Sequence, residues 1–273
     1  MRAFFTGLLL LTLTAVWAQR NCGTMDVLAE QLIQNPALQQ QMQAIEQHND
    51  HYHDHQHEQV GFRAVVTIPV VFHIIHNGDA VGSNENISDA LILAQLQQLN
   101  DDFRKMNTDA ALVPSIFQGV HADTEIQFCL AQRKPDGTTT NGINRVQFSQ
   151  ATWTSSQVNS TVKPGTIWDR NQYLNVWSVA FGSGSSGILG YAQFPGGAAS
   201  TDGVVVAYYS VGSLAMVNPG SSTFGKGRTL THEVGHWLNL RHIWGDATCG
   251  NDLVADTPVH NTSNGGCPAY PHL

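Results

Sequence analysis

The sequence has few charged residues and no run of basic ones. Only 12% of its 273 residues are Asp, Glu, Lys or Arg, and the formal net charge is -8. A protein that binds nucleic acid needs a basic surface to neutralise phosphates, so we expect no nucleic-acid partner. The hydrophobic content of 42% favours a globular domain over a disordered chain.

Long apolar stretches are missing beyond the N-terminus. Arg2 precedes an apolar stretch, residues 4–16, that is short for a membrane span, and Ala18 is a small residue at a suitable cleavage site. Residues 1–18 are therefore predicted to be a signal peptide, with an uncleaved anchor as the alternative. We expect a secreted protein without membrane contact after signal cleavage. Its oligomeric state is not indicated.

Cysteines are few, and they fall into three cases. The chain has Cys22, Cys129, Cys249 and Cys267. Secretion permits disulfides, and Cys249 and Cys267 could bridge across a short loop. Cys129 lies in an apolar stretch and is predicted to be a buried strand thiol.

One histidine-rich stretch carries the chemistry. His232 and His236 are four residues apart, so on a helix they lie on one face and can share one Zn²⁺. Glu233 stands beside them, where it can act as a base toward water. His242 can reach the same metal only if the helix ends and the chain turns sharply. Asn239 lies where a left-handed helix stop is needed, and Asn tolerates that conformation.

The remaining elements predict an α+β fold. Apolar residues mark strands near residues 64–76, 124–132, 143–148, 173–179, 188–195 and 203–209. Ser88 is expected to cap a helix of about eighteen residues. Leu230, Val234, Trp237 and Leu238 recur at helical spacing and would root the metal-binding helix in the core.

The metal-binding stretch resembles a known signature. Residues 232–242 resemble the metzincin motif His-Glu-x-x-His-x-x-Gly-x-x-His, with Asn239 in the place of Gly. The run to Asp246, with Trp237 and Trp244, is similar to the pappalysin-like branch. The resemblance implies a catalytic domain over residues 63–273, with a mixed twisted sheet, a backing helix and an active-site helix. It implies a secreted zinc endopeptidase that hydrolyses protein or peptide substrates with a Glu general base.

Residues 19–62 differ in composition and are predicted to be a pro-segment. One or two amphipathic helices are expected between residues 26 and 47, broken near Pro36. Five histidines between residues 48 and 57 are interpreted as a solvated linker, or alternatively a loose metal chelator. Cys22 could be a stray or disulfide-forming cysteine, but in Cys-Gly-Thr it resembles the cysteine switch of this group. That implies a fourth zinc ligand in a latent zymogen, which is released by cleavage between the pro-segment and the catalytic domain near Arg63.

Two further sites rest on the resemblance. In metzincins an edge strand above the metal pairs with substrate, which assigns this role to residues 188–194, with the substrate-binding residues Leu189, Gly190, Tyr191 and Ala192. Calcium binding is implied for a loop whose candidate ligands are Asp252, Asp256 and Thr257. Without the resemblance, this loop would be interpreted as solvated.

Methionine is absent after His242. Metzincins have a methionine turn beneath the zinc, so we expect the C-terminal part of the domain to be missing, the chain itself to be potentially inactive, and Cys249 and Cys267 to have other partners. Two alternatives stay open. One is a gluzincin-type peptidase, with a Glu in place of His242 as third ligand. The other is a non-catalytic exported zinc-binding protein.

Overall fold

A twisted, mostly parallel sheet forms the centre of the protein. The computed structural model describes residues 21–55 and 64–264. Within them the strands follow the order β1-β6-β7-β5-β2-β3, with β4 also paired to β2. Their bounds are β1 Asn21–Cys22, β2 Val66–His76, β3 Ile126–Leu130, β4 Ile143–Gln147, β5 Leu174–Val179, β6 Ile188–Ala192 and β7 Val204–Ala207. Only the β6–β7 pair is antiparallel.

Strand β2 is the axis of this sheet. One of its sides pairs with β5, and the other pairs first with β3 and then with β4. Its middle and second half are buried on both faces. A continuous apolar run is typical of parallel strands covered by helices on both sides, which explains why β2 shows no polar alternation.

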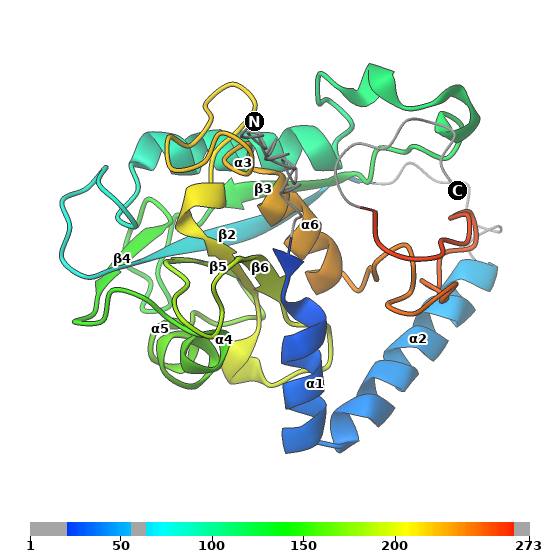
Figure 1. Ribbon diagram of the computed structural model, residues 1–273, viewed down its shortest axis with the longest axis horizontal. Helices are drawn as coiled ribbons and strands as arrows, with labels where there is room; N and C mark the ends of the chain where they lie inside the picture. Colours follow the sequence, from blue (N-terminus) through cyan, green and yellow to red (C-terminus); the bar gives the residue numbers. More distant parts are fainter. Residues whose placement is uncertain (1–20, 56–63, 265–273) are drawn as a thin grey trace, which may run out of the picture.

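Helices cover both faces of the sheet (Figure 1). Helices α3 (Asp89–Phe103) and α6 (Arg228–Trp237) pack on one face through one apolar cluster. The short helices α4 (Ser155–Gln157) and α5 (Lys163–Thr166), joined by a π-helical turn at Val158–Val162, cover the other. Single 3₁₀ turns lie at Ala110–Leu112, Ser115–Phe117, Ala199–Thr201 and Tyr208–Ser210. The predicted mixed sheet with a backing helix, α3, and an active-site helix, α6, is confirmed.

Helix α3 begins where the sequence predicts. The Ser88 hydroxyl accepts a hydrogen bond from the Leu91 N–H at 3.3 Å, which makes it the N-cap. The helix has 15 residues rather than about eighteen.

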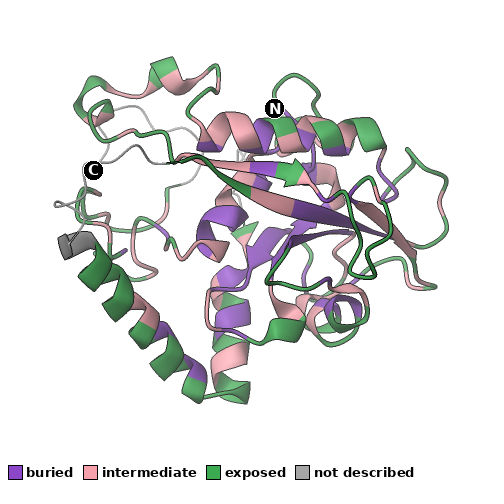
Figure 2. Cartoon of the chain, turned by 180° about the vertical axis from the view of Figure 1, so that it is seen from behind, coloured by how far each residue is buried: buried purple, intermediate pink, exposed green. Residues whose placement is uncertain are grey.

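Two helices precede β2 and diverge in a V beside α6 (Figure 1). Helices α1 (Thr24–Gln34) and α2 (Ala37–His55) are separated near Pro36, as predicted. Leu28, Leu38 and Met42 pack together on Phe194. Most of α2 is exposed (Figure 2). Residues 48–55 of the histidine-rich tract continue α2 as helix, and their role as a solvated linker or a metal chelator stays a prediction.

The structure tests the prediction for Cys129 but not the pairing of Cys249 with Cys267. Cys129 is exposed, so the predicted buried thiol is wrong. Successive side chains of β3 point to opposite faces of the sheet. Phe128 lies in the core, and Cys129 lies on the other face, which is uncovered at this edge strand. The signal peptide, Arg63 and Cys267 lie outside the described residues, and so does the Cys249–Cys267 pairing. Among the described helices, none has both the length and the apolar character to cross a membrane.

A buried histidine lies in β2. His73 Nε2 donates to Asn175 Oδ1 at 2.9 Å, and its Nδ1 accepts from Asn144 Nδ2 at 3.0 Å. The Asn175 side chain is fixed because its Oδ1 also accepts from Trp168 N, while its Nδ2 donates to Trp168 O. The ring stacks on Trp177 at 5.1 Å. Burial lowers the pKa of His73 to about 4, outweighing the hydrogen bond to Asn175.

His73 should therefore make the fold acid-sensitive. Its pKa is about 6.5 in the unfolded chain and about 4 in the folded one, so between these values the unfolded state binds more protons. The free energy of unfolding should fall by about 3 kcal/mol, from this residue alone, as the pH drops from 6.5 to 4. In His73→Gln, urea unfolding at several pH values under the same metal conditions should show a smaller loss. Equal losses in both proteins would contradict the assignment.

Candidate metal centre

Helix α6 and the turn after it deliver three histidines to one point. Leu230 and Val234 are fully buried against the sheet, and Trp237 and Leu238 pack beside them, as predicted. Asn239 has φ of +79°, so it adopts the predicted left-handed conformation.

Hydrogen bonds close this turn. Asn239 N donates to His236 O, and Leu240 N donates to Gly235 O, each at 2.9 Å. The chain therefore folds back over the end of α6 and carries His242 toward the helix.

The ring nitrogens lie at the spacing of metal ligands. His236 Nε2 lies 3.1 Å from His232 Nε2 and 3.2 Å from His242 Nε2. Two ligand nitrogens on a tetrahedral Zn²⁺, with bonds of about 2.0–2.1 Å, are about 3.3 Å apart. Cys22 completes the group, and all four ligand atoms lie within 4.8 Å of one another. Within residues 21–55 and 64–264 this is the one such group of His, Cys, Asp or Glu.

The protons of these rings indicate a cation. His236 Nδ1 donates to Leu240 O at 2.6 Å, because a carbonyl can only accept. His242 Nδ1 faces Asp246 Oδ1 at 2.6 Å and donates to that carboxylate, while its ring stacks on Trp244 at 4.3 Å. Burial lowers the pKa of His236 to about 4, so this ring is neutral. The bare Nε2 lone pair of His236 thus faces the Nε2 atoms of His232 and His242, an arrangement that a shared Zn²⁺ would stabilise.

Glu233 lies on the same helix turn, enclosed by residues from the N-terminal segment. Its side chain is fully buried. Thr24 Oγ1 donates to Glu233 Oε2 at 3.0 Å, and the Cys22 thiol lies 3.5 Å from the same oxygen. Burial, and then the Glu233 charge, raise the pKa of the Cys22 thiol. Coordination to a cation at the three nitrogens would act in the opposite direction, because it favours the thiolate.

Thr24 is a site residue that sequence reasoning did not single out. It is fully buried, and its hydroxyl also accepts from Ala192 N at 2.9 Å. One hydroxyl therefore binds both the carboxylate of α6 and the backbone of β6. The sequence signal was its place two residues after Cys22, in Cys-Gly-Thr.

Strand β6 forms the wall of the site. Strand β1 runs parallel to it, and Gly23 N donates to Gly190 O at 2.9 Å. The predicted edge strand is thus covered at this point by the N-terminal segment. A Cβ on Gly190 would lie 2.8 Å from Glu233 Cγ and 2.9 Å from Val205 O, so only glycine fits between the carboxylate and β7.

The predicted substrate-binding residues of β6 differ in whether a side chain or only the backbone could contact a peptide. The side chains of Leu189 and Tyr191 are buried, and Tyr191 belongs to the cluster on the opposite face, where its hydroxyl donates to Asn159 Oδ1 at 3.0 Å. A substrate role for β6 therefore falls to its backbone, at Gly190 and Ala192. That role stays a prediction.

The predicted calcium loop lies after the third histidine. Asp252 is buried and its Oδ1 accepts from Val254 N at 3.1 Å, whereas Asp256 is exposed. Thr257 is half-buried. Calcium binding by Asp252, Asp256 and Thr257 stays a prediction.

This fold and donor set define a metallopeptidase domain of the metzincin type. The profile of the peptidase family described as pregnancy-associated plasma protein-A matches residues 154–267. Mature mirolysin of Tannerella forsythia, solved with a cleaved peptide, is 43% identical, with a TM-score of 0.69 over 77% of each chain. A promirolysin mutant of Tannerella forsythia is 38% identical, with a TM-score of 0.74, covering 93% of this chain and 80% of that one.

Curated relatives point the same way. An extracellular metalloprotease of Verticillium alfalfae is 31% identical over 209 residues, which are 76% of this chain and 62% of that protein. One of Colletotrichum graminicola is 30% identical, also with 62% of its length covered. The chain thus spans less than two thirds of these relatives. It belongs to the pregnancy-associated plasma protein-A family of metallopeptidases.

Proposed function

We propose that the protein is a secreted zinc endopeptidase made as a latent zymogen. The observation that carries the proposal is the convergence of His232, His236 and His242 Nε2 atoms beside the buried Glu233. His236 Nε2 is a bare acceptor that lies 3.1 Å from His232 Nε2 and 3.2 Å from His242 Nε2, a spacing that suits a shared metal ion. Zn²⁺, when bound, supplies Lewis acidity that polarises a carbonyl.

The chain's own residues supply the proton transfers. Glu233 lies next to the ligand cluster and takes a proton from the attacking water, then passes it to the leaving amine. The Nδ1 bonds of His236 and His242 hold the two rings in a fixed orientation. The Gly190 position keeps the Glu233 side chain against β6, where a peptide backbone would lie.

Backbone pairing along β6 is the proposed mode of substrate binding. Gly190 O and Ala192 N are both bonded by the N-terminal segment, so both are accessible to hydrogen-bonding groups from outside the sheet. A peptide laid along this edge would bind with little dependence on its sequence. The cleaved peptide in the mirolysin structure supports a peptide substrate.

Latency is proposed to come from Cys22 and Thr24. Cys22 would supply the fourth ligand of a bound Zn²⁺, in the position that catalysis needs open, and Thr24 hydrogen-bonds to Glu233, the proposed base. Residues 19–62 would be the pro-segment, with residues 63–273 forming the catalytic domain as far as this chain extends. In support, the promirolysin match covers 93% of the chain and the mature mirolysin match 77%.

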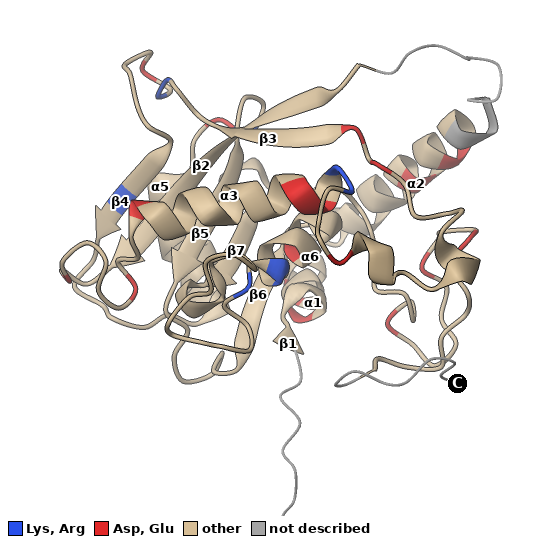
Figure 3. Cartoon of the chain, turned by 90° about the horizontal axis from the view of Figure 1, so that it is seen from above, with Lys and Arg blue, Asp and Glu red and all other residues tan. Residues whose placement is uncertain are grey.

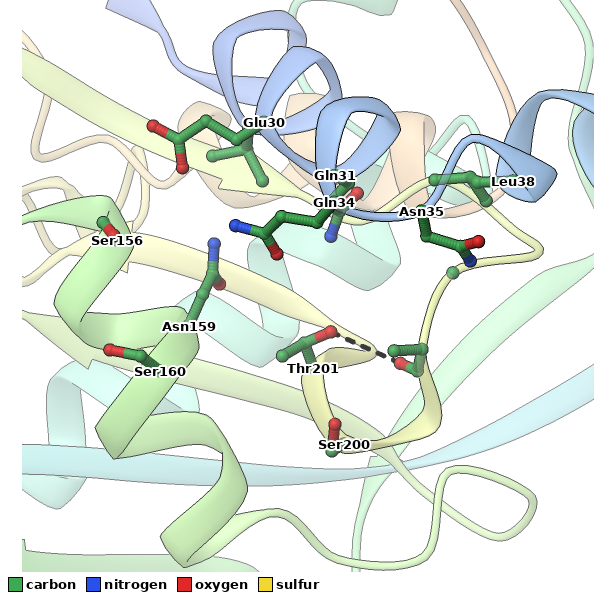
Figure 4. Close-up of a pocket in the computed structure, with 13 residues that line it drawn as sticks. Glu30, Gln31, Gln34, Asn35, Leu38, Ser156, Asn159, Ser160, Ser200 and Thr201 are labelled. Carbon is green, nitrogen blue, oxygen red and sulfur yellow. Dashed lines mark hydrogen bonds between the residues drawn. The ribbon is translucent and has the colours of Figure 1, made fainter.

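Helix α1 packs on the domain through the buried Val27 and Leu28, and a hollow remains beside it. A hollow of about 260 Å³ separates it from the π-helical turn, with Gln34, Asn159 and Thr201 around it (Figure 4). Gln31 Nε2 bridges to Gln193 Oε1 at 3.0 Å. Buried Val27, Leu28, Leu38 and Met42 also hold this segment on the domain, so its release is proposed to follow a cut after α2.

Secretion is proposed from two lines of support. Residues 1–18 have the pattern of a signal peptide. The relatives named above are called extracellular metalloproteases.

The third ligand separates this proposal from a gluzincin-type peptidase. In His242→Ala, the bound zinc measured after dialysis should fall from one per chain to well below one, because a structural donor is lost. His121→Ala, in a distant loop, is the matched control and should keep its zinc. Full zinc content in His242→Ala would instead favour a carboxylate as the third ligand.

A further inference from the structure

The residue just before the third histidine is paired with the N-terminal segment. Arg241 Nη2 donates to Glu46 Oε1 at 3.2 Å, and Asn239 Nδ2 donates to the same oxygen at 3.2 Å. Glu46 belongs to α2, which rises from the tip of the V toward the loops after α6 (Figure 1). A carboxylate from the proposed pro-segment is thus bound by two donors that belong to the catalytic domain.

Glu46 binds only one of the two nitrogens that Arg241 presents along one edge of its guanidinium. The guanidinium presents Nε and Nη2 along one edge, and a carboxylate fits both at once. Glu46 bonds Nη2, whereas the buried Nε of Arg241 has no hydrogen-bond partner among the described residues. A carboxylate in a different position could therefore bind both nitrogens of Arg241 at once.

The site lies close to the metal ligands and beyond the end of β6. The Phe194 ring lies 5.9 Å from the Arg241 guanidinium carbon and 5.6 Å from the His236 ring. Phe194 follows β6 by two residues. An extended peptide rises about 3.3 Å per residue, so one that passes Gly190 reaches Phe194 within two to four residues.

We propose that Arg241 and Asn239 form a subsite for an acidic side chain of the substrate, which Glu46 occupies in the latent form. The inference rests on the proposed function, because it requires a peptide along β6 and departure of the pro-segment. Antiparallel pairing, the more stable ladder, places the N-terminal side of the peptide toward Phe194. The preferred acid would then lie two to four residues before the scissile bond.

Nearby acids limit the size of the effect. A hollow of about 500 Å³ beside Glu46 is lined in part by Asp50, Asp252 and Asp256. Acidic positions mark both α2 and the loops beside it (Figure 3). These charges oppose an incoming carboxylate unless it reaches the guanidinium itself. The side chain of Arg241 is 24% exposed, so the pair is only partly shielded from water.

Paired peptides test the subsite on the zinc-loaded full chain after its pro-segment has been cut and released. The peptides are identical except for Glu or Gln at the second, third or fourth residue before the cleaved bond. At one of these positions kcat/KM should favour Glu by about fivefold, the range of a partly exposed ion pair. Arg241→Gln should bring that ratio to about one. Arg133→Gln, which makes the same charge change in a distant loop, should preserve it.

A binding measurement keeps the inference separate from catalysis. Zinc-loaded Glu233→Gln protein, treated in the same way, should bind the Glu peptide about fivefold more tightly than the Gln peptide. A ratio near one, or a ratio unchanged by Arg241→Gln, overturns the subsite while leaving the peptidase proposal intact. Failure to cleave or bind either peptide overturns both.

Discussion

Replacing Glu233 by glutamine should leave one zinc bound and reduce peptide cleavage by about a thousandfold, within the range of general acid–base catalysis. Glutamine has nearly the same shape, so the buried position next to Gly190 stays filled. The amide cannot take a proton from water, which removes the base and leaves the three ligands. Zinc content and kcat on the same preparation, with the pro-segment released, measure both effects.

A conservative change elsewhere gives the control for this result. Glu125→Gln removes one carboxylate in the turn before β3, and both zinc content and turnover should stay unchanged. Retained turnover in Glu233→Gln would disprove the mechanism. Loss of zinc would show that the carboxylate holds the metal site together instead.

The same experiment tests the alternative that this chain is a non-catalytic zinc-binding protein. That alternative requires the zinc-loaded wild-type chain to be inactive with its pro-segment released. The comparison should include a longer form that covers the full length of a curated relative, because the chain spans 62% of the protein of Verticillium alfalfae. Cleavage by either form, lost in Glu233→Gln, excludes simple metal sequestration.

The metal-binding helix could be predicted because its information is local. The spacing of His232, Glu233 and His236 fixes one helix face. Asn239 marks the turn, and its φ of +79° confirms that a side chain tolerant of the left-handed region stands where the helix must end. The role of His242 as third ligand could then be predicted because this residue comes shortly after the turn at Asn239. The strands β2 to β7 were similarly visible, with ends that differ by a few residues, whereas the two-residue β1 was not predicted.

Contacts across the sequence could not be predicted in this way. Thr24 and Glu233 are 209 residues apart, and Glu46 and Arg241 are 195 apart, so neither pair leaves a periodic signal. The prediction that Cys129 is buried was wrong for a related reason. Its apolar neighbours predicted a strand, but which face of that strand is covered depends on the position of β3 at the sheet edge.

Within the proposed pro-segment, Cys22 and Thr24 should contribute separately to the proposed latency. Cys22→Ala opens the fourth ligand position, so the uncut zinc-loaded chain should cleave peptide on the order of a hundredfold faster than uncut wild type, since a thiolate–zinc bond exceeds one charged hydrogen bond. Thr24→Val removes the bond to Glu233 and the bond from Ala192, and should raise basal activity by about tenfold. Thr24→Ser keeps the hydroxyl and should stay latent.

Cobalt substitution gives a readout that does not depend on activity. With Co²⁺ in place of zinc, a thiolate ligand adds a charge-transfer band in the near ultraviolet. Because Cys22 lies within ligand distance of the three histidines, uncut wild type and Thr24→Val should both show this band, and Cys22→Ala should lack it. A band that is absent from uncut wild type would mean that the thiol blocks Glu233 without binding the metal. In that case Thr24 and Cys22 would act on the same carboxylate, and their effects on basal activity would no longer be separable.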